Sequence, residues 1–173
     1  MKKPFHHIVL TKILGEELWL AFSSSGICAS EFKELTSLSN FRKCLKKRTG
    51  ETFLRVQSLP EGMEKAIEHW KIHGYCSDLN FETSSYSSFQ QKVWNQCSQI
   101  PLGETSTYSE IAKSINSPKA QRAVGSALGA NPVPVLIPCH RVLRNDGSVG
   151  GYAYGSHLKE LLLARESYAK VLD

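Results

Sequence analysis

Alternating apolar and polar positions dominate the first third of the chain. Apolar residues cluster at 7–10 and 27–29 and alternate over 18–22, with breaks at Gly15-Glu16 and over 23–26. A period of two is typical of half-buried strands, and short polar breaks between such runs are typical of hairpins. The pattern predicts an antiparallel meander of three strands.

Helical periodicity follows this meander. Phe41, Cys44 and Leu45 can share one face of a helix, and a second apolar stripe ends near Gly74. Residues 53–56 predict a short strand between the two helices. The second stripe consists of Met63, Ala66, Ile67 and Trp70. Together these features predict a small α+β unit whose residues are mostly structural.

A linker-like stretch separates this unit from the rest. Residues 83–88 read Thr-Ser-Ser-Tyr-Ser-Ser, and beyond them one helical pattern follows another with short turns. We therefore predict two domains, residues 1–85 and 86–173. Ser88 and Gln91 have the spacing of a capping box that opens the first helix of the second domain. The expected buried stripe of that helix is Phe89, Val93, Trp94, Cys97 and Ile100.

Two short helices around a tight turn form the next pattern. Thr107 and Glu110 have the capping-box spacing again, and Asn116 marks the turn after the first helix. Ser117 is the predicted N-cap of the second helix, which Gly129 ends. The pattern predicts a helix-turn-helix, an arrangement that is common in helical proteins and that reads DNA in some of them.

The outer face of that second helix carries one long cation among small residues. It presents Gln121, Arg122, Gly125 and Ser126. Glycine inside a helix costs about 1 kcal/mol relative to alanine, so Gly125 suggests a surface that lies against something. A nucleic acid and a tightly packed neighbouring helix both fit this pattern.

The charge distribution permits a nucleic-acid partner without demanding one. The net charge is +5, and the stretch between Glu110 and Asp146 contains no acidic residue. Its cations are Lys113, Lys119, Arg122, Arg141 and Arg144. Such a field attracts a polyanion, although a solvated basic face is the alternative. We interpret a second basic run, at 42–48, as a solvated surface helix.

The five cysteines fit neither a disulfide framework nor a zinc site, because their number is odd and no Cys-x-x-Cys pair occurs. The sequence also lacks the roughly 20-residue apolar run of a membrane span and the apolar stretch of a secretory signal. We therefore expect a cytoplasmic protein in which each cysteine is either a buried apolar residue or a reactive thiol.

One cysteine lies in a chemically active context. Residues 131–134 predict a rigid turn and 135–137 a short buried strand, and Cys139 follows with an imidazole and a guanidinium directly after it. Both groups are expected to favour the thiolate over the thiol. A thiolate nucleophile usually needs a base that a third group orients. Glu160 and Glu166 are the nearby carboxylate candidates.

Several blocks around this cysteine share one resemblance. The sequence PCHRV at 138–142, with RAVG at 122–125 and NPVP at 131–134, resembles the O6-alkylguanine-DNA alkyltransferases, or methylated-DNA-protein-cysteine methyltransferases. The resemblance covers about 89–166. It implies a ribonuclease-H-like α/β domain followed by a helical DNA-binding domain of winged-helix, helix-turn-helix kind.

The resemblance also implies an activity. A monomer without metal or cofactor would transfer the alkyl group of O6-methylguanine, or of O4-methylthymine, in double-stranded DNA to Cys139. His140, acting through a water and oriented by Glu166, would draw the proton from the thiol. Tyr108 would protonate the leaving guanine, and Asn131 would support the active-site turn. The resulting thioether is stable, so each molecule would act once.

DNA and substrate contacts follow from the same resemblance. The implied DNA-contacting residues are Tyr108, Ser117, Arg122, Gly125 and Ser126. Arg122 would replace the flipped nucleotide, while small side chains let the helix enter the narrow minor groove. The implied pocket comprises Pro134, Val142, Tyr152, Ala153 and Tyr154. Backbone carbonyls at Cys139 and Val142 and the N–H of Ala153 would hold the base, and the bulk of Tyr154 would restrict large alkyl groups.

Two other functions remain open from the sequence. A non-catalytic lesion-binding protein of the alkyltransferase-like kind would bind alkylated bases, but that class lacks the nucleophilic cysteine. A thiol hydrolase or peptidase with a Cys-His-Glu set would need an oxyanion hole, and it leaves the basic helix-turn-helix unexplained. Turnover of an ester or peptide would identify the hydrolase.

Overall fold

The computed structural model describes residues 6–171, with side chains up to residue 167. Three strands form the predicted antiparallel meander: β1 (His6–Ile13), β2 (Glu16–Ser23) and β3 (Gly26–Phe32). A two-residue turn at Leu14-Gly15, both with positive φ, joins the first two strands. The short strand β4 (Leu54–Arg55) adds in parallel to β1, and the sheet order is β3-β2-β1-β4.

The two faces of this sheet pack against different partners. Helix α1 (Leu38–Thr49) packs on one face, where Phe41 and Leu45 meet Trp19. Cys44, predicted to share that buried face, is exposed instead. Phe41 and Leu45, which are four residues apart, already fill the contact between α1 and the sheet. The opposite face packs on helix α2 (Glu61–His73) and on the second half of the chain.

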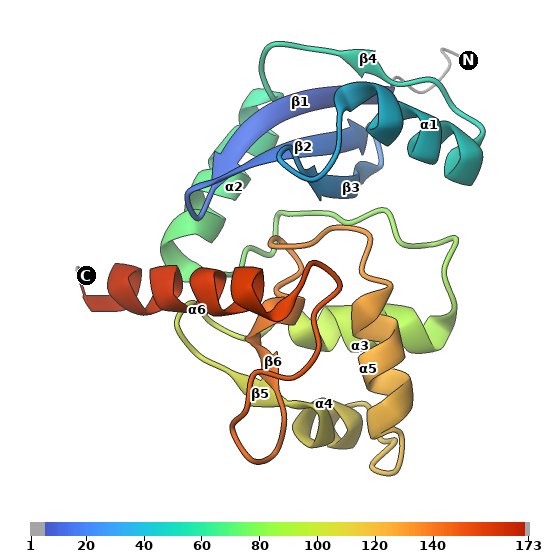
Figure 1. The fold of residues 1–173 in the computed structure, drawn as a ribbon. Helices are drawn as coiled ribbons and strands as arrows, with labels where there is room; N and C mark the ends of the chain where they lie inside the picture. The colour runs from blue at the N-terminus through green and yellow to red at the C-terminus, as the bar shows by residue number, and fades with distance from the viewer. Residues whose placement is uncertain (1–5, 172–173) are drawn as a thin grey trace.

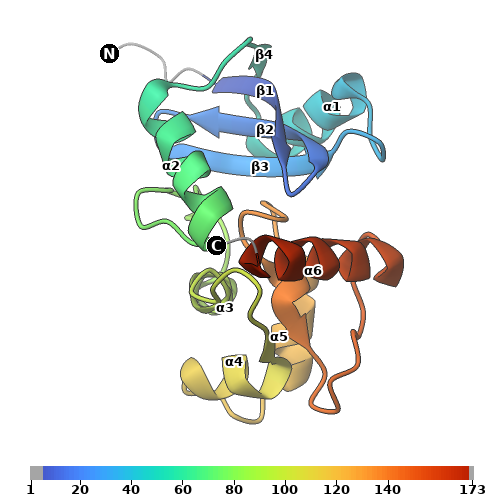
Figure 2. The same ribbon diagram turned by 90° about the vertical axis from the view of Figure 1, so that its left-hand side faces the viewer.

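The second half is helical, as predicted. Its elements surround a core that continues from the sheet, with α4 at the end of the molecule farthest from α1 (Figure 1; Figure 2). The division after residue 85 stays a prediction. The elements are α3 (Ser88–Cys97), β5 (Ser106–Thr107), α4 (Tyr108–Ser114), α5 (Gln121–Gly129), the 3-10 turn η1 (Cys139–Arg141), β6 (Val142–Leu143) and α6 (Ser156–Val171).

Two predicted helix starts are displaced. The capping box of α3 uses Ser87 and Gln90, one residue earlier than predicted, because Ser87 has the extended backbone of an N-cap. Helix α5 begins after Ala120 and not after Ser117. The backbone N–H of Ser117 donates a hydrogen bond to the carbonyl of Ala112. A further turn, closed by the N–H of Ala120 on the carbonyl of Ser117, separates Ser117 from α5. The predicted capping box of α4, formed by Thr107 and Glu110, is confirmed.

The predicted strand at 135–137 is a tight turn. Val135 has a φ of 75°, and the N–H of Ile137 donates to the carbonyl of Val133 at 2.9 Å. The prolines at 132 and 134 have no N–H to donate to a sheet, so this segment turns where an apolar run alone predicts a strand. Elsewhere, no helix within residues 6–171 combines the length and apolarity needed to cross a bilayer.

Candidate active site

A cavity of about 670 Å³ lies among α4, α5, η1 and the segment that leads to α6. Cys139 lines it, and the predicted residues that line it with Cys139 are Tyr108, Arg122, Gly125, Tyr152 and Ala153. Helices from the helix-turn-helix therefore form one wall of the cavity that contains the candidate nucleophile. The volume lies in the range of small-molecule pockets.

Other residues predicted for the site do not line this cavity. Ser117, Ser126, Pro134, Val142 and Tyr154 are all within the described chain but outside the lining. The ring of Tyr154 packs edge-on against Phe32 of β3, with 4.8 Å between ring centroids, and against Tyr152 at 5.5 Å. Tyr154 therefore contacts Tyr152, which lines the cavity, without lining it itself.

Asn131 positions the thiol of Cys139. Its Nδ2 donates to Sγ of Cys139 at 3.1 Å and to the carbonyl of Ile137 at 2.8 Å. Its Oδ1 accepts from the N–H of Val133 at 2.9 Å. One amide thus fixes both ends of the turn and contacts the sulfur that the turn presents.

The sulfur of Cys139 is a protonated thiol in the resting protein. Burial raises the pKa of Cys139 above its usual value, and the Asn131 hydrogen bond and the charge of Lys159 offset only part of this effect. The guanidinium of Arg141 is bound to Glu166 and to the carbonyl of Gly74. Because the pKa of Cys139 is raised, the sulfur needs a base to become a nucleophile.

That base is adjacent to Cys139. The Nε2 of His140 lies 2.7 Å from Oε1 of Glu166, and both side chains are buried. Burial lowers the pKa of His140, and the hydrogen bond to Glu166 offsets part of the shift, so the imidazole is neutral and donates Nε2–H. No described residue bonds to its buried Nδ1, which is left as the proton acceptor. Glu160, the other carboxylate candidate, is exposed.

Arg141 anchors Glu166, a role that the sequence analysis missed. Its Nε and Nη2 donate to the carboxylate at 2.9–3.1 Å, while Nη1 donates to the carbonyls of Gly74 and Ile100. The guanidinium also lies 5.2 Å from the ring centre of Trp70. Burial raises the pKa of Glu166, but its hydrogen bonds and charge interactions with His140 and Arg141 lower that pKa by more. The net pKa lies below 4.5, so the carboxylate is charged.

Lys159 is a second residue that sequence reasoning missed. It is buried in α6, and its Nζ donates to the carbonyl of Val142 at 2.6 Å. Burial lowers the pKa of Lys159. The sequence does contain a sign of this role: Lys159 lies within the apolar stripe of α6, beside Leu158 and Leu162. A buried cation at such a position needs a hydrogen-bond acceptor.

The resting thiol leads to a prediction for pH dependence. Below its pKa the sulfur is protonated and unreactive, and burial raises that pKa above the usual 9.0. Carbamidomethylation of Cys139 by iodoacetamide should therefore still accelerate between about pH 8 and about pH 10. Peptide mass mapping separates Cys139 from the exposed Cys44, the internal comparison. A rate for Cys139 that is already level near about pH 7 contradicts the assignment.

Comparison with known proteins decides the family. Residues 88–168 match the family described as 6-O-methylguanine DNA methyltransferase, DNA binding domain. The solved structure of Mycobacterium tuberculosis OGT in complex with DNA is similar over 94% of each chain, with 30% identity and a TM-score of 0.72. The chain belongs to the O6-alkylguanine-DNA alkyltransferase family. The resemblance inferred from PCHRV and its flanking blocks is confirmed, as is the mixed α+β architecture.

Curated alkyltransferases match the second half of the chain. The methylated-DNA–protein-cysteine methyltransferase of Methanosarcina acetivorans is 52% identical over 80 residues, which are 46% of this chain and 51% of that protein. The inducible enzyme of Bacillus subtilis is 52% identical over 83 residues, 48% of this chain and 46% of its own. The chain thus spans about half the length of the curated relatives it matches.

Proposed function

We propose that this chain is a cytoplasmic, monomeric DNA-repair enzyme. It transfers the alkyl group of O6-methylguanine or O4-methylthymine in double-stranded DNA irreversibly to Sγ of Cys139. The observation that carries the proposal is the shared cavity: Cys139 lines it together with Arg122 and Gly125 of the helix-turn-helix. A base flipped out of DNA held on α5 would enter the cavity that contains the nucleophile. Family membership supports the same reaction.

The site geometry supports one order of proton and bond changes. A water relays the Sγ proton of Cys139 to Nδ1 of His140, and Glu166 stabilises the imidazolium that forms. The sulfur attacks the alkyl carbon, and the bond between that carbon and O6 breaks with its electrons going to the guanine. Burial raises the pKa of Tyr108, so its hydroxyl keeps a proton to give to the departing base. The products are guanine and S-alkylcysteine.

Backbone groups around η1 can hold the base. The carbonyl of Val142 already accepts from Lys159, but a carbonyl has two lone pairs and can accept a second bond from a guanine amino group. The carbonyl of Cys139 accepts from the N–H of Val142 and keeps a lone pair in the same way. Ala153, whose N–H is the proposed donor to the base, lines the cavity.

The exposed face of α5 fits a minor groove. A Cβ on Gly125 would lie 3.7 Å from the ring of Tyr108, which is ordinary contact, so packing inside the protein does not require a glycine there. Absence of a side chain instead leaves the helix free to approach a partner closely. The minor groove is about 6 Å wide and admits a helix only where its side chains are small.

Arg122 gives a prediction for this DNA contact. Its side chain is exposed and lines the cavity mouth, where it can fill the space of the flipped nucleotide. Arg122→Ala should slow transfer from a duplex by about tenfold or more, because flipping costs a few kcal/mol and each 1.4 kcal/mol is about a factor of ten. Transfer from the free alkylated base, which needs no flipping, should be unchanged. An equal loss on both substrates contradicts this role.

Single-turnover kinetics with a duplex carrying one O6-methylguanine test the proposal. The expected result is unmodified guanine in the DNA, with at most one event per protein molecule. Turnover of a thioester or peptide substrate, combined with an unchanged lesion, would instead favour the hydrolase. Lesion binding with neither reaction would favour a recognition protein.

A further inference from the structure

The charge of the whole molecule is concentrated on one helix that the proposed function does not use. Helix α1 carries five cations and no acidic residue, so its formal charge equals the +5 of the entire chain. The cations are Arg42, Lys43, Lys46, Lys47 and Arg48. The rest of the chain is therefore neutral overall.

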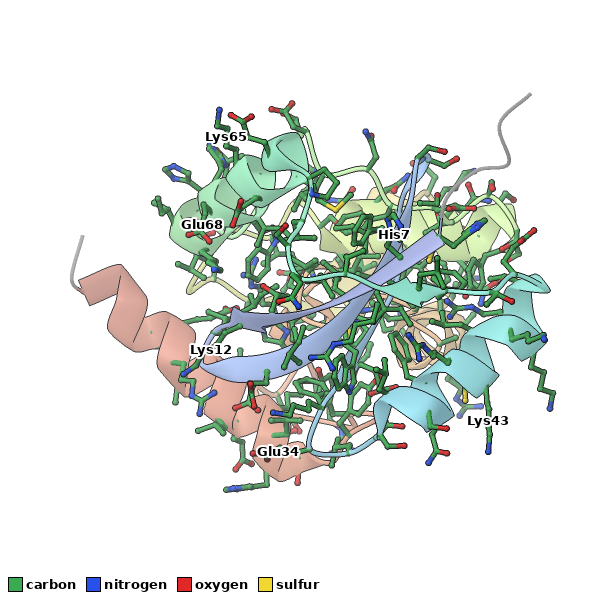
Figure 3. All side chains as sticks on the ribbon, turned by 90° about the horizontal axis from the view of Figure 1, so that it is seen from above. His7, Lys12, Glu34, Lys43, Lys65 and Glu68 are labelled. Atoms are coloured by element: carbon green, nitrogen blue, oxygen red, sulfur yellow. The ribbon has the colours of Figure 1, made fainter. Side chains whose placement is uncertain are left out.

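These cations lack neutralising partners. No carboxylate among the described residues forms an ion pair with any of them, whereas on α2 Lys65 pairs with Glu61 and Lys71 pairs with Glu68, each at 2.6 Å. Figure 3 shows Lys43 pointing away from the sheet. Because unpaired like charges along one helix repel each other, a bound polyanion would relieve a repulsion that the protein itself leaves in place.

A groove beside α1 combines these cations with other phosphate-binding groups. Its volume is about 430 Å³, and Arg42, Lys43 and Lys46 line it together with the hydroxyl residues Ser39 and Thr52. Lys46 lies one helical turn beyond Arg42, so both side chains can face the same strand of a bound polyanion.

One atom in this groove lacks a partner. The Nε of Arg42 is buried, and no described residue accepts a hydrogen bond from it. The side chain can therefore move towards a bound anion without losing a hydrogen bond at Nε. Glu51 is the one carboxylate in the lining.

We propose that α1 and this groove form a second DNA-binding surface that holds the phosphate backbone of a separate duplex segment. Cations with hydroxyl groups beside them match a phosphodiester chain. The groove beside α1 shares no lining residue with the cavity beside α5, so the two surfaces are separate. The chain therefore bridges two segments, which assists transfer along DNA during the search for lesions.

The choice of DNA as the occupant rests on the proposed function, which places the protein on DNA through α5. Binding at α1 itself needs neither an alkylated base nor Cys139. The number of duplexes bound and the rate of alkyl transfer can therefore be measured separately, and failure of one does not imply failure of the other.

Sedimentation equilibrium with an excess of a short unmodified duplex tests the bridge. The wild-type protein should bind two duplexes per chain. A Lys43→Gln/Lys46→Gln/Lys47→Gln variant should bind one, with transfer to a lesion duplex unchanged. A Lys12→Gln/Lys65→Gln/Lys71→Gln variant loses the same charge elsewhere and should still bind two. Circular dichroism checks that both variants are folded.

Four outcomes would overturn the bridge. These are one duplex per wild-type chain, two duplexes retained by the α1 variant, loss of the second duplex in the control variant, and a complex of two chains with two duplexes, which would indicate dimerisation. Binding of phosphatidylglycerol vesicles that depends on the three α1 lysines, with only one duplex bound, would reassign the surface to a membrane.

Discussion

A Cys139→Ala chain is expected to leave O6-methylguanine unrepaired in a duplex that it still binds. The sulfur is the only atom of the proposed site that forms a bond to the alkyl carbon, so transfer should fall to background. DNA contacts come from α5, which the substitution does not touch, and affinity should stay within about threefold of wild type. Chromatography of digested DNA measures the repair, and fluorescence anisotropy measures the binding.

The control for this loss is another cysteine. Cys44 is exposed on α1, away from the cavity, and Cys44→Ala should keep the wild-type rate of transfer. Repair that survives in Cys139→Ala, or that disappears in Cys44→Ala, would place the acceptor sulfur elsewhere.

Arg141→Met should cause the largest loss of stability, about 3–5 kcal/mol in the free energy of unfolding. The substitution leaves the charge of Glu166 buried with only His140 as a partner. Adding Glu166→Gln removes that charge and should restore part of the loss. Arg165→Met is the matched control, because Arg165 also pairs with a carboxylate, that of Glu16, but is partly exposed. Its cost should be about 1 kcal/mol or less.

Urea denaturation at several pH values checks this prediction and its sign. The folded-state pKa of Glu166 lies below the usual 4.5, so the stability it contributes is present above that pH and is lost as the pH falls through the folded pKa. The double variant Arg141→Met/Glu166→Gln should lack this acid-dependent loss. An equal pH dependence in wild type and double variant would show that Glu166 is not the charged partner of Arg141.

Local patterns predicted the elements that depend on neighbouring residues. The period-two alternation gave the meander because its two faces bury separate sets of side chains, with Trp19 on the face towards α1 and Leu20 on the other. Capping of α4 was predictable because Thr107 and Glu110 satisfy each other within one turn. The turn at 135–137 was not, because its apolar residues are buried by tertiary contacts that an apolar run cannot distinguish from those of a strand.

Long-range partners account for the rest of what the sequence did not predict. The identity of the carboxylate that meets His140 came from family resemblance, since 26 residues separate it from Glu166. The role of Arg141 depends on carbonyls of Gly74 and Ile100, which no sequence pattern marks as acceptors. The position of Tyr154 outside the cavity lining depends on its packing against Phe32 of the sheet.

Intact-mass spectrometry of the wild-type protein after incubation with an O6-methylguanine duplex tests the central claim most directly. The account predicts a single mass increase of about 14 Da, one methyl group in place of a hydrogen, located by peptide mapping on Cys139 with no second addition at excess duplex. An unmodified protein beside repaired DNA, or a methyl group on any other residue, would contradict the account.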